Sequence, residues 1–279
     1  MAPALSTFTI FGVAILAGIV GAVLGLGGGI IIVPALTLMY GFEIRTAVAA
    51  SAVAVIATST GAAIAYLRDR ITNTRIAMLL EVGTTAGALS GALIAGLVPA
   101  RFLFLLFGGL MGYSAWSMFR ARKAELPEGV TPDRFSERLR LKGAYYDQAL
   151  GRTVAYQATG TLPGLGLMYL SGALAGLLGI GGGAFKVLAM DQVMRLPIKV
   201  STATSNFMIG VTAAAGAAVY FVRGDVEPLV AGPVALGVLA GAMVGARMMV
   251  RLKGSTLRLL FIPVLVYIAV QMAWKGASL

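Results

Sequence analysis

The chain has 279 residues, with no cysteine, no histidine and only 12% charged residues. Without cysteine there is no disulfide framework and no thiolate ligand for a metal. Without histidine the commonest metal ligand and the usual proton shuttle at neutral pH are both missing. An ordinary Ser-His-Asp triad is therefore absent, and the glycine runs lack the Lys-Ser/Thr ending of a P-loop. These absences argue against a hydrolytic, zinc or redox enzyme and against ATP-driven pumping. We expect no enzymatic activity, no cofactor and no metal.

Apolar residues take the place of charge. Hydrophobic residues make up 58% of the chain and its mean hydropathy is +0.90, whereas soluble domains carry about 25% charged residues. Two long apolar stretches, 8–41 and 161–194, contain the glycine runs. We therefore predict a multi-pass protein of the cytoplasmic membrane, with the lipid bilayer as its partner. Six further stretches are nearly free of charge, and most reach the ~17–25 residues that span a bilayer: 46–67, 76–98, 102–119, 200–222, 229–246 and 259–274.

The net charge of +11 lies at the ends of these stretches. Eight Lys or Arg residues lie in 120–152, four in 247–258 and three in 68–75, but only one each in 99–101 and 223–228. Cytoplasmic loops of membrane proteins are enriched in Lys and Arg. We therefore place the first three segments in the cytoplasm and the last two outside. This distribution also argues against nucleic acid as a partner.

A short glycine-rich phrase occurs twice. Gly25–Gly29 (GLGGG) returns as Gly179–Gly183 (GIGGG), 154 positions later, and each copy lies within a long apolar stretch. A duplication inside an apolar chain is typical of transporters built from two repeats. Five further pairs keep the same offset: Gly12 and Gly166, Gly18 and Gly172, Leu24 and Leu178, Arg45 and Lys199, and Ser51 and Ser205.

The charge pattern makes the repeats inverted. Span 46–67 then runs inward and its counterpart 200–222 runs outward. The predicted fold is an all-α integral membrane protein with two inverted-topology repeats, each with a Gly-broken dipping helix pair plus about three transmembrane helices. The competing interpretation makes 8–41 and 161–194 full spans and the repeats parallel. We divide the chain into repeat 1 (1–122), a cytoplasmic linker (123–160) and repeat 2 (161–279).

The linker is the only soluble-looking region. Tyr145 and Tyr156 flank a Gly-containing turn with partial alternation, which is compatible with a short hairpin. The plainer interpretation is an ordered connector that holds the two halves together.

The glycine runs are the first candidates for a binding site. Each Gly in a helix costs about 1 kcal/mol relative to Ala, so three in a row favour a break that frees backbone N–H groups for an anion. The alternative is helix packing, which we favour at Gly12, Gly18, Gly87, Gly91, Gly237 and Gly241. The expected substrate-binding glycines are Gly25, Gly27, Gly28, Gly29, Gly179, Gly181, Gly182 and Gly183.

Hydroxyl and amide groups beside the runs complete the candidate site. Ser51 and Ser205 are equivalent by repeat position, and Thr204 and Asn206 lie next to the second of them. As a set, these groups are suited to coordinate an oxyanion. Taken singly, a membrane Ser or Thr more often bonds to its own helix or joins helices.

Charged residues inside apolar stretches cost at least ~2.5–3.5 kcal/mol at a helix centre. Lys186 follows the second run and is a candidate anion attractor, with snorkelling to the interface as the alternative. Asp191 and Glu81 are candidates for proton coupling. For Asp191 we expect pairing with Lys186 or Arg195, and for Glu81 pairing with Arg75. At Arg45 and Lys199 we expect interfacial anchoring.

These motifs resemble the sulfite exporter TauE/SafE family. The resemblance lies in Gly21–Gly29 with Val33 and Pro34, in Ser171–Gly183 followed by Leu196–Asn206, and in the linker tyrosines with Asp147 and Gly151. It covers nearly the whole chain. It implies secondary transport, commonly export, of sulfite, sulfoacetate and other organosulfonates through a prokaryotic cytoplasmic membrane. It also carries a role over to the Gly motifs and to Thr204 and Ser205. The second copy lacks the proline of the first, which predicts half-helices of different geometry.

We therefore expect a secondary transporter of a small sulfur-containing anion that works by alternating access. A passive anion channel and a non-transporting membrane assembly subunit are the alternatives. Homo-oligomerisation is compatible with each of these three roles. The sequence leaves the direction of transport, the coupling ion and the individual anion open.

Overall fold

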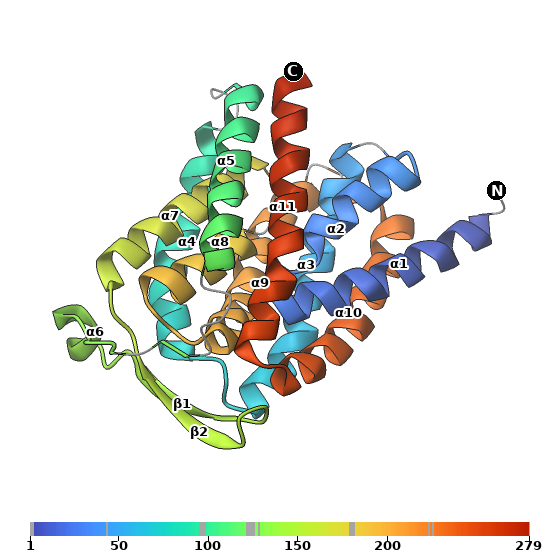
Figure 1. Cartoon of the computed structure of the whole chain (residues 1–279). Helices are drawn as coiled ribbons and strands as arrows, with labels where there is room; N and C mark the ends of the chain where they lie inside the picture. Colours follow the sequence, from blue (N-terminus) through green and yellow to red (C-terminus); the bar gives the residue numbers. More distant parts are fainter. Residues whose placement is uncertain are drawn as a thin grey trace.

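The computed structural model describes residues 3–42, 44–94, 99–120, 126–127, 129–178, 182–222, 224 and 226–278. Eight helices of 18 to 25 residues form the body of this part of the chain (Figure 1). The elements of the first half are α1 (Pro3–Leu24), α2 (Gly29–Pro34), the π-helical η1 (Ala35–Met39), α3 (Ile44–Arg68), α4 (Thr74–Ile94) and α5 (Ala100–Arg120). The linker contributes α6 (Arg134–Arg138), β1 (Lys142–Asp147) and β2 (Arg152–Gln157). The second half has α7 (Thr161–Leu178), α8 (Gly183–Leu188), the π-helical η2 (Ala189–Val193), α9 (Ile198–Val222), α10 (Pro228–Arg251) and α11 (Gly254–Ser278).

The order of elements in the first half recurs in the second. In each, a long helix ends before a glycine run, and a six-residue helix and a five-residue π-helical segment follow. Three long helices complete each half. Helices α2 and α8 have the same length, although only the first ends with a proline.

The two halves are packed into each other. Helix α1 packs along α10 of the other half and α7 packs along α4, while α5 and α11 lie side by side. Glycines allow the close approach. A Cβ on Gly18 would meet the backbone of Val238, and Cβ atoms on Gly87 and Gly91 would meet the backbone of α7. The packing role is thus confirmed for these glycines and for Gly237 and Gly241, which face α1. It is wrong for Gly12, where a Cβ would meet nothing within 4 Å.

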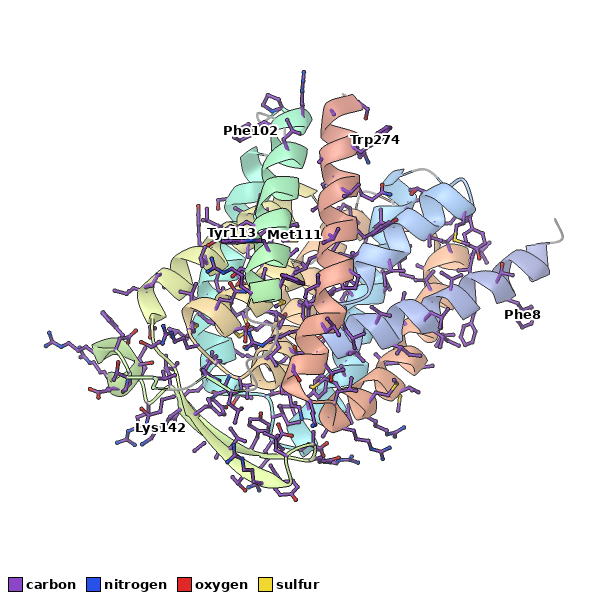
Figure 2. All side chains as sticks on the ribbon, viewed as in Figure 1. Phe8, Phe102, Met111, Tyr113, Lys142 and Trp274 are labelled. Carbon is purple, nitrogen blue, oxygen red and sulfur yellow. The ribbon has the colours of Figure 1, made fainter. Side chains whose placement is uncertain are left out.

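Apolar side chains cover the outside of the helical body. Within the described residues, five helices are long and apolar enough to cross a membrane. They contain the stretches Thr7–Leu24, Ala49–Arg68, Ile198–Val222, Pro228–Arg251 and Gly254–Ser278. Figure 2 shows Phe8, Phe102 and Trp274 projecting from the helices, and Phe8 and Trp274 are each 76% exposed. Such a surface requires lipid, so the protein is a multi-pass membrane protein.

The linker folds into a two-stranded antiparallel hairpin, one of the two structures with which its sequence is compatible. Tyr145 faces Val154 and Gly143 faces Tyr156 in its register. The all-α prediction therefore holds for the membrane part but not for this connector. Asn73 at the start of α4 donates hydrogen bonds to the Tyr156 hydroxyl and the Lys142 carbonyl.

Three basic segments lie at one end of the molecule. The loop before α4 contacts the hairpin through Asn73, and Lys199 joins the hairpin residue Asp147 to the carbonyl of Val250 at the end of α10. Figure 1 shows the hairpin at the opposite end of the molecule from the start of α5. This shared face fits the predicted cytoplasmic placement of 68–75, 120–152 and 247–258.

Candidate functional site

The first glycine run breaks the chain between α1 and α2. Gly25, Gly27 and Gly28 have φ values of 70°, 77° and 70°, a region that L side chains rarely adopt. A Cβ on Gly28 would lie 3.1 Å from the carbonyl oxygen of Ala17, so α2 begins beside α1. Gly28 caps α2 without a side-chain hydrogen bond. The first-turn N–H groups of α2 therefore have no side-chain cap.

The second run has the same form where it is described. Gly182 has φ 63° and caps α8, again without a side-chain hydrogen bond. Ser171 of α7 donates a hydrogen bond to the Gly182 carbonyl. Gly179 and Gly181, two of the expected binding residues, lie outside the described residues.

The two breaks touch. A Cβ on Gly183 would lie 2.5 Å from the carbonyl oxygen of Gly25 and 2.9 Å from Cα of Leu26. The hydroxyl of Ser205 lies between them, 2.9 Å from the carbonyl oxygen of Gly25 and 3.3 Å from that of Gly183. Segments 154 positions apart in the sequence thus meet beside one buried serine of α9.

Other expected polar residues have separate places around this contact. The Asn206 amide donates to the Ala22 carbonyl at the end of α1. Ser51 lies beside the start of α2, because a Cβ on Gly29 would lie 2.5 Å from the Ser51 Oγ. Thr204 instead accepts a hydrogen bond from the backbone N–H of Asn73, on the hairpin side.

Some polar atoms of α9 have no hydrogen-bond partner although they are fully buried. They are Oγ of Ser201, Oγ1 of Thr202 and Oδ1 of Asn206. Thr202 is also next to the first break, since a Cβ on Gly25 would lie 3.0 Å from its carbonyl oxygen. A buried polar atom without a hydrogen bond costs free energy. A solute or a water molecule that bonds to these atoms would remove that cost, and its binding would therefore be favourable.

Lys186 is completely buried on α8, so snorkelling is excluded. Its Nζ donates a 2.7 Å hydrogen bond to Thr212 of α9 and lies 3.6 Å from Oε2 of Glu81 on α4. The Thr212 hydroxyl donates a 2.6 Å bond to the other oxygen of Glu81. Among the described ion pairs Glu81 is therefore joined to Lys186, and the expected pairing with Arg75 is wrong.

The remaining charges also have partners that sequence proximity did not indicate. Asp191 pairs with Arg258 of α11 at 2.7 Å, not with Lys186 or Arg195. Next to it, Gln192 accepts a hydrogen bond from Ser117 of α5. Lys199 is buried and pairs with Asp147 of the hairpin at 2.7 Å, which replaces the expected interfacial anchoring. The side chain of Arg45 lies outside the described residues.

A cavity of about 500 Å³ lies away from the glycine breaks. It is bounded by the hairpin, the start of the linker and the turn before α9. None of the expected binding residues lines it. Its lining includes Lys142, Tyr156, Arg195 and Pro197.

Sequence reasoning missed Thr212, Arg258 and Asp147, which hold the buried charges. One signal was available for Arg258. It is a charge four residues inside α11, a position that requires a partner in a membrane protein. Thr212 carried no such signal, because isolated threonines are common in membrane helices.

Comparison with known proteins agrees with the membrane architecture. The family model of the sulfite exporter TauE/SafE matches residues 10–272. The probable membrane transporter protein YunE of Bacillus subtilis is 28% identical over 269 residues, which cover 94% of this chain and 95% of that protein. The probable membrane transporter protein YdhB of the same organism is 25% identical and covers 83% of this chain and 86% of its own. No solved structure gives a significant match.

Proposed function

Because the chain belongs to the sulfite exporter TauE/SafE family, we propose that it is a secondary transporter of small sulfur-containing anions, sulfite or organosulfonates. Its place is the cytoplasmic membrane and its direction is export. The observation that carries the proposal is the contact of the two glycine breaks beside Ser205. A pair of broken helices in contact at the centre of a repeat-built membrane protein is the arrangement in which transporters hold their substrates.

The substrate would bind to groups that converge on this contact. In the first run the N–H groups of Gly25, Leu26 and Gly27 already donate to carbonyls at the end of α1, so the anion would bind to those of Gly28 and Gly29. Backbone N–H groups of Gly179–Gly183 would bind it from the other side, because half-helix N-termini carry a partial positive charge. Ser51, Ser205 and Asn206 would add hydroxyl and amide contacts, with Thr204 supporting α9 from the hairpin side. Lys186 would supply the full positive charge. The unpaired atoms of Ser201 and Thr202 support the inclusion of this face of α9.

Alternating access would arise from the two repeats, inverted in the membrane, moving against each other around the breaks. Because α1 packs along α10 of the second half and α7 along α4 of the first, this movement would require both of these interfaces to repack. Glu81 and Asp191 are the candidates for coupling the movement to a proton.

Flux in proteoliposomes tests the proposal. Purified protein should give saturable uptake or efflux of a radiolabelled sulfonate that follows the imposed anion gradient. Flux that rises linearly with concentration and tracks voltage would indicate a passive channel instead. No sulfonate or sulfite flux in either direction, together with a stable partner recovered by pull-down, would indicate an assembly subunit. Both results would contradict the proposal.

A further inference from the structure

Lys186 and Glu81 form a buried contact between opposite charges that is incompletely hydrogen-bonded. The Lys186 side chain is 0% exposed and that of Glu81 is 12% exposed. The ammonium and the carboxylate do not bond directly at 3.6 Å, but share the hydroxyl of Thr212. The Glu81 oxygen nearest Lys186, Oε2, has no hydrogen bond. Because the two charges do not bond directly, their attraction offsets only part of the free energy needed to remove them from water.

The fold does not require this pair. The offset of 154 positions relates Lys186 to Ile32, Thr212 to Thr58 and Glu81 to Ala235. Ile32 is 2% exposed and packs in an apolar cluster with Ala54 of α3 and Val234 of α10. The equivalent place around Ile32, where α2 and α3 meet α10, is therefore packed with apolar residues. The Lys186–Glu81 pair costs stability, and the equivalent place around Ile32 has no such pair. This difference indicates that the pair serves a function.

We propose that Glu81 is the resident counter-ion of Lys186, and that the transported anion takes its place, so that binding of one monoanion is accompanied by uptake of one proton on Glu81. This inference rests on the proposed transport function and adds its coupling. Before binding, the ammonium and the carboxylate sum to zero charge. After binding, the ammonium, the anion and the neutral carboxylic acid again sum to zero. A buried site that stays neutral avoids the cost of an unpaired charge in every step.

Glu81 is the partly exposed member of the pair, and we therefore assign the proton to it rather than to the fully buried Lys186. The proton adds to a carboxylate oxygen, and no covalent bond breaks in the substrate. The hydroxyl of Thr85 on α4 donates a hydrogen bond to Glu81. In the described parts of the helices packed on α4, Tyr169 of α7 bonds to Ser90 and Lys199 of α9 pairs with Asp147, so neither is bonded to Glu81. Export of the anion together with this proton is electroneutral.

The test is binding of isethionate, a sulfonate that stays a monoanion at all accessible pH values, measured by calorimetry on the full-length protein in detergent. Because one proton is taken up with each anion, wild-type affinity should rise about tenfold per unit fall in pH. In E81Q the affinity should be independent of pH and higher than that of the wild type at alkaline pH. As a matched control, D69N, which removes the acid of an exposed ion pair, should keep the wild-type slope.

A double variant with the residues of the two equivalent positions, Ala235 and Ile32, tests whether the pair is needed for folding; it is E81A/K186I. It should keep the wild-type unfolding temperature and lose at least tenfold in isethionate affinity. Wild-type binding with no pH dependence, an unchanged slope in E81Q, or wild-type affinity in the folded double variant would each overturn the exchange but leave the transporter proposal standing. Absence of sulfonate binding and flux at every pH would overturn the transporter proposal itself.

Discussion

The two halves of the molecule share an order of helices but differ in polarity. In the first half the residues that surround the break are mostly apolar, whereas in the second half they carry hydroxyl, amide and charged groups. The same 154-residue offset relates Ile32 to Lys186, Thr37 to Asp191, Ala47 to Ser201, Ala52 to Asn206 and Phe104 to Arg258. Ser51 and Ser205 are a polar pair that both halves keep.

This difference separates what the fold needs from what it does not. The first half shows that a glycine break, a short helix and a π-helical segment form without nearby charges. The polar residues of the second half are therefore additions to a scaffold that folds without them. Exchanging residues between equivalent positions tests this interpretation, because each substitution introduces a side chain that the other half already accommodates.

The largest effect should come from breaking the Asp191–Arg258 pair. R258F introduces the residue found at the equivalent position of the first half, Phe104, but leaves the Asp191 carboxylate, which is 0% exposed, without its partner. We expect a loss of about 3–5 kcal/mol in stability, seen as a lower unfolding temperature in detergent. The double variant D191T/R258F removes both charges and should recover most of this loss. A double variant as unstable as the single one would show that the charges are required by the fold.

The next effect concerns the contact between the breaks. In G183A the new Cβ would meet the backbone of Gly25 and Leu26, which cannot rotate away. In G29A it would meet only the side chains of Ser51 and Val55. Overpacking costs about 1–3 kcal/mol, which corresponds to roughly tenfold or more in a binding equilibrium. Sulfonate flux in proteoliposomes should therefore fall more in G183A than in G29A.

Gly166 offers the control for this comparison. It lies in α7, and a Cβ there would meet nothing within 4 Å. G166A should keep wild-type flux and gain up to about 1 kcal/mol in helix stability. Equal flux in G183A and G166A would contradict a functional contact between the breaks.

A smaller effect is expected from the two equivalent serines. Ser205 bonds to the Gly25 carbonyl in the opposite half, whereas Ser51 lies beside Gly29 of its own half. S205A removes a hydrogen bond that joins the halves, at a cost of about 1 kcal/mol. We expect S205A to raise the KM for sulfonate flux several-fold and S51A to change it less. The opposite order would assign the main polar contact to the first half.

The repeated breaks were predictable from the sequence, but the partners of the buried charges were not. The repeat offset predicted the second break and its equivalence to the first, whereas the partial alternation in the linker was compatible with the hairpin without predicting it. Partners of the buried charges were not predictable, because Glu81 and Lys186 are far apart in sequence while Arg75 is only six positions from Glu81. Proximity in sequence favoured local pairs, and helix packing brought distant residues together instead.

The smallest effect on stability is expected in the linker, where a carboxylate is hydrogen-bonded to the start of the second half. The Asp133 carboxylate accepts hydrogen bonds from the backbone N–H groups of Ser136 and Thr161. Burial raises the pKa of Asp133, but these hydrogen bonds outweigh burial and hold it below its ordinary value of 3.8. The ionised carboxylate therefore stabilises this junction above that value, and the stabilisation is lost as the pH falls below it.

Limited proteolysis of the linker over an acidic pH series measures this effect. Cleavage should increase at the acid end in the wild type. In D133N, which carries no titrating group at this position, cleavage should change less with pH. The same acid sensitivity in both proteins would assign it to another group.

A structure of the protein with a bound sulfonate tests the central claim most directly. We expect density for the sulfonate between the first break, Gly25–Gly29, and the start of α8. Lys186 should contact the anion, and Glu81 should no longer contact Lys186. A sulfonate bound only in the linker cavity beside Lys142 and Arg195, with the Lys186–Glu81 contact unchanged, would contradict it.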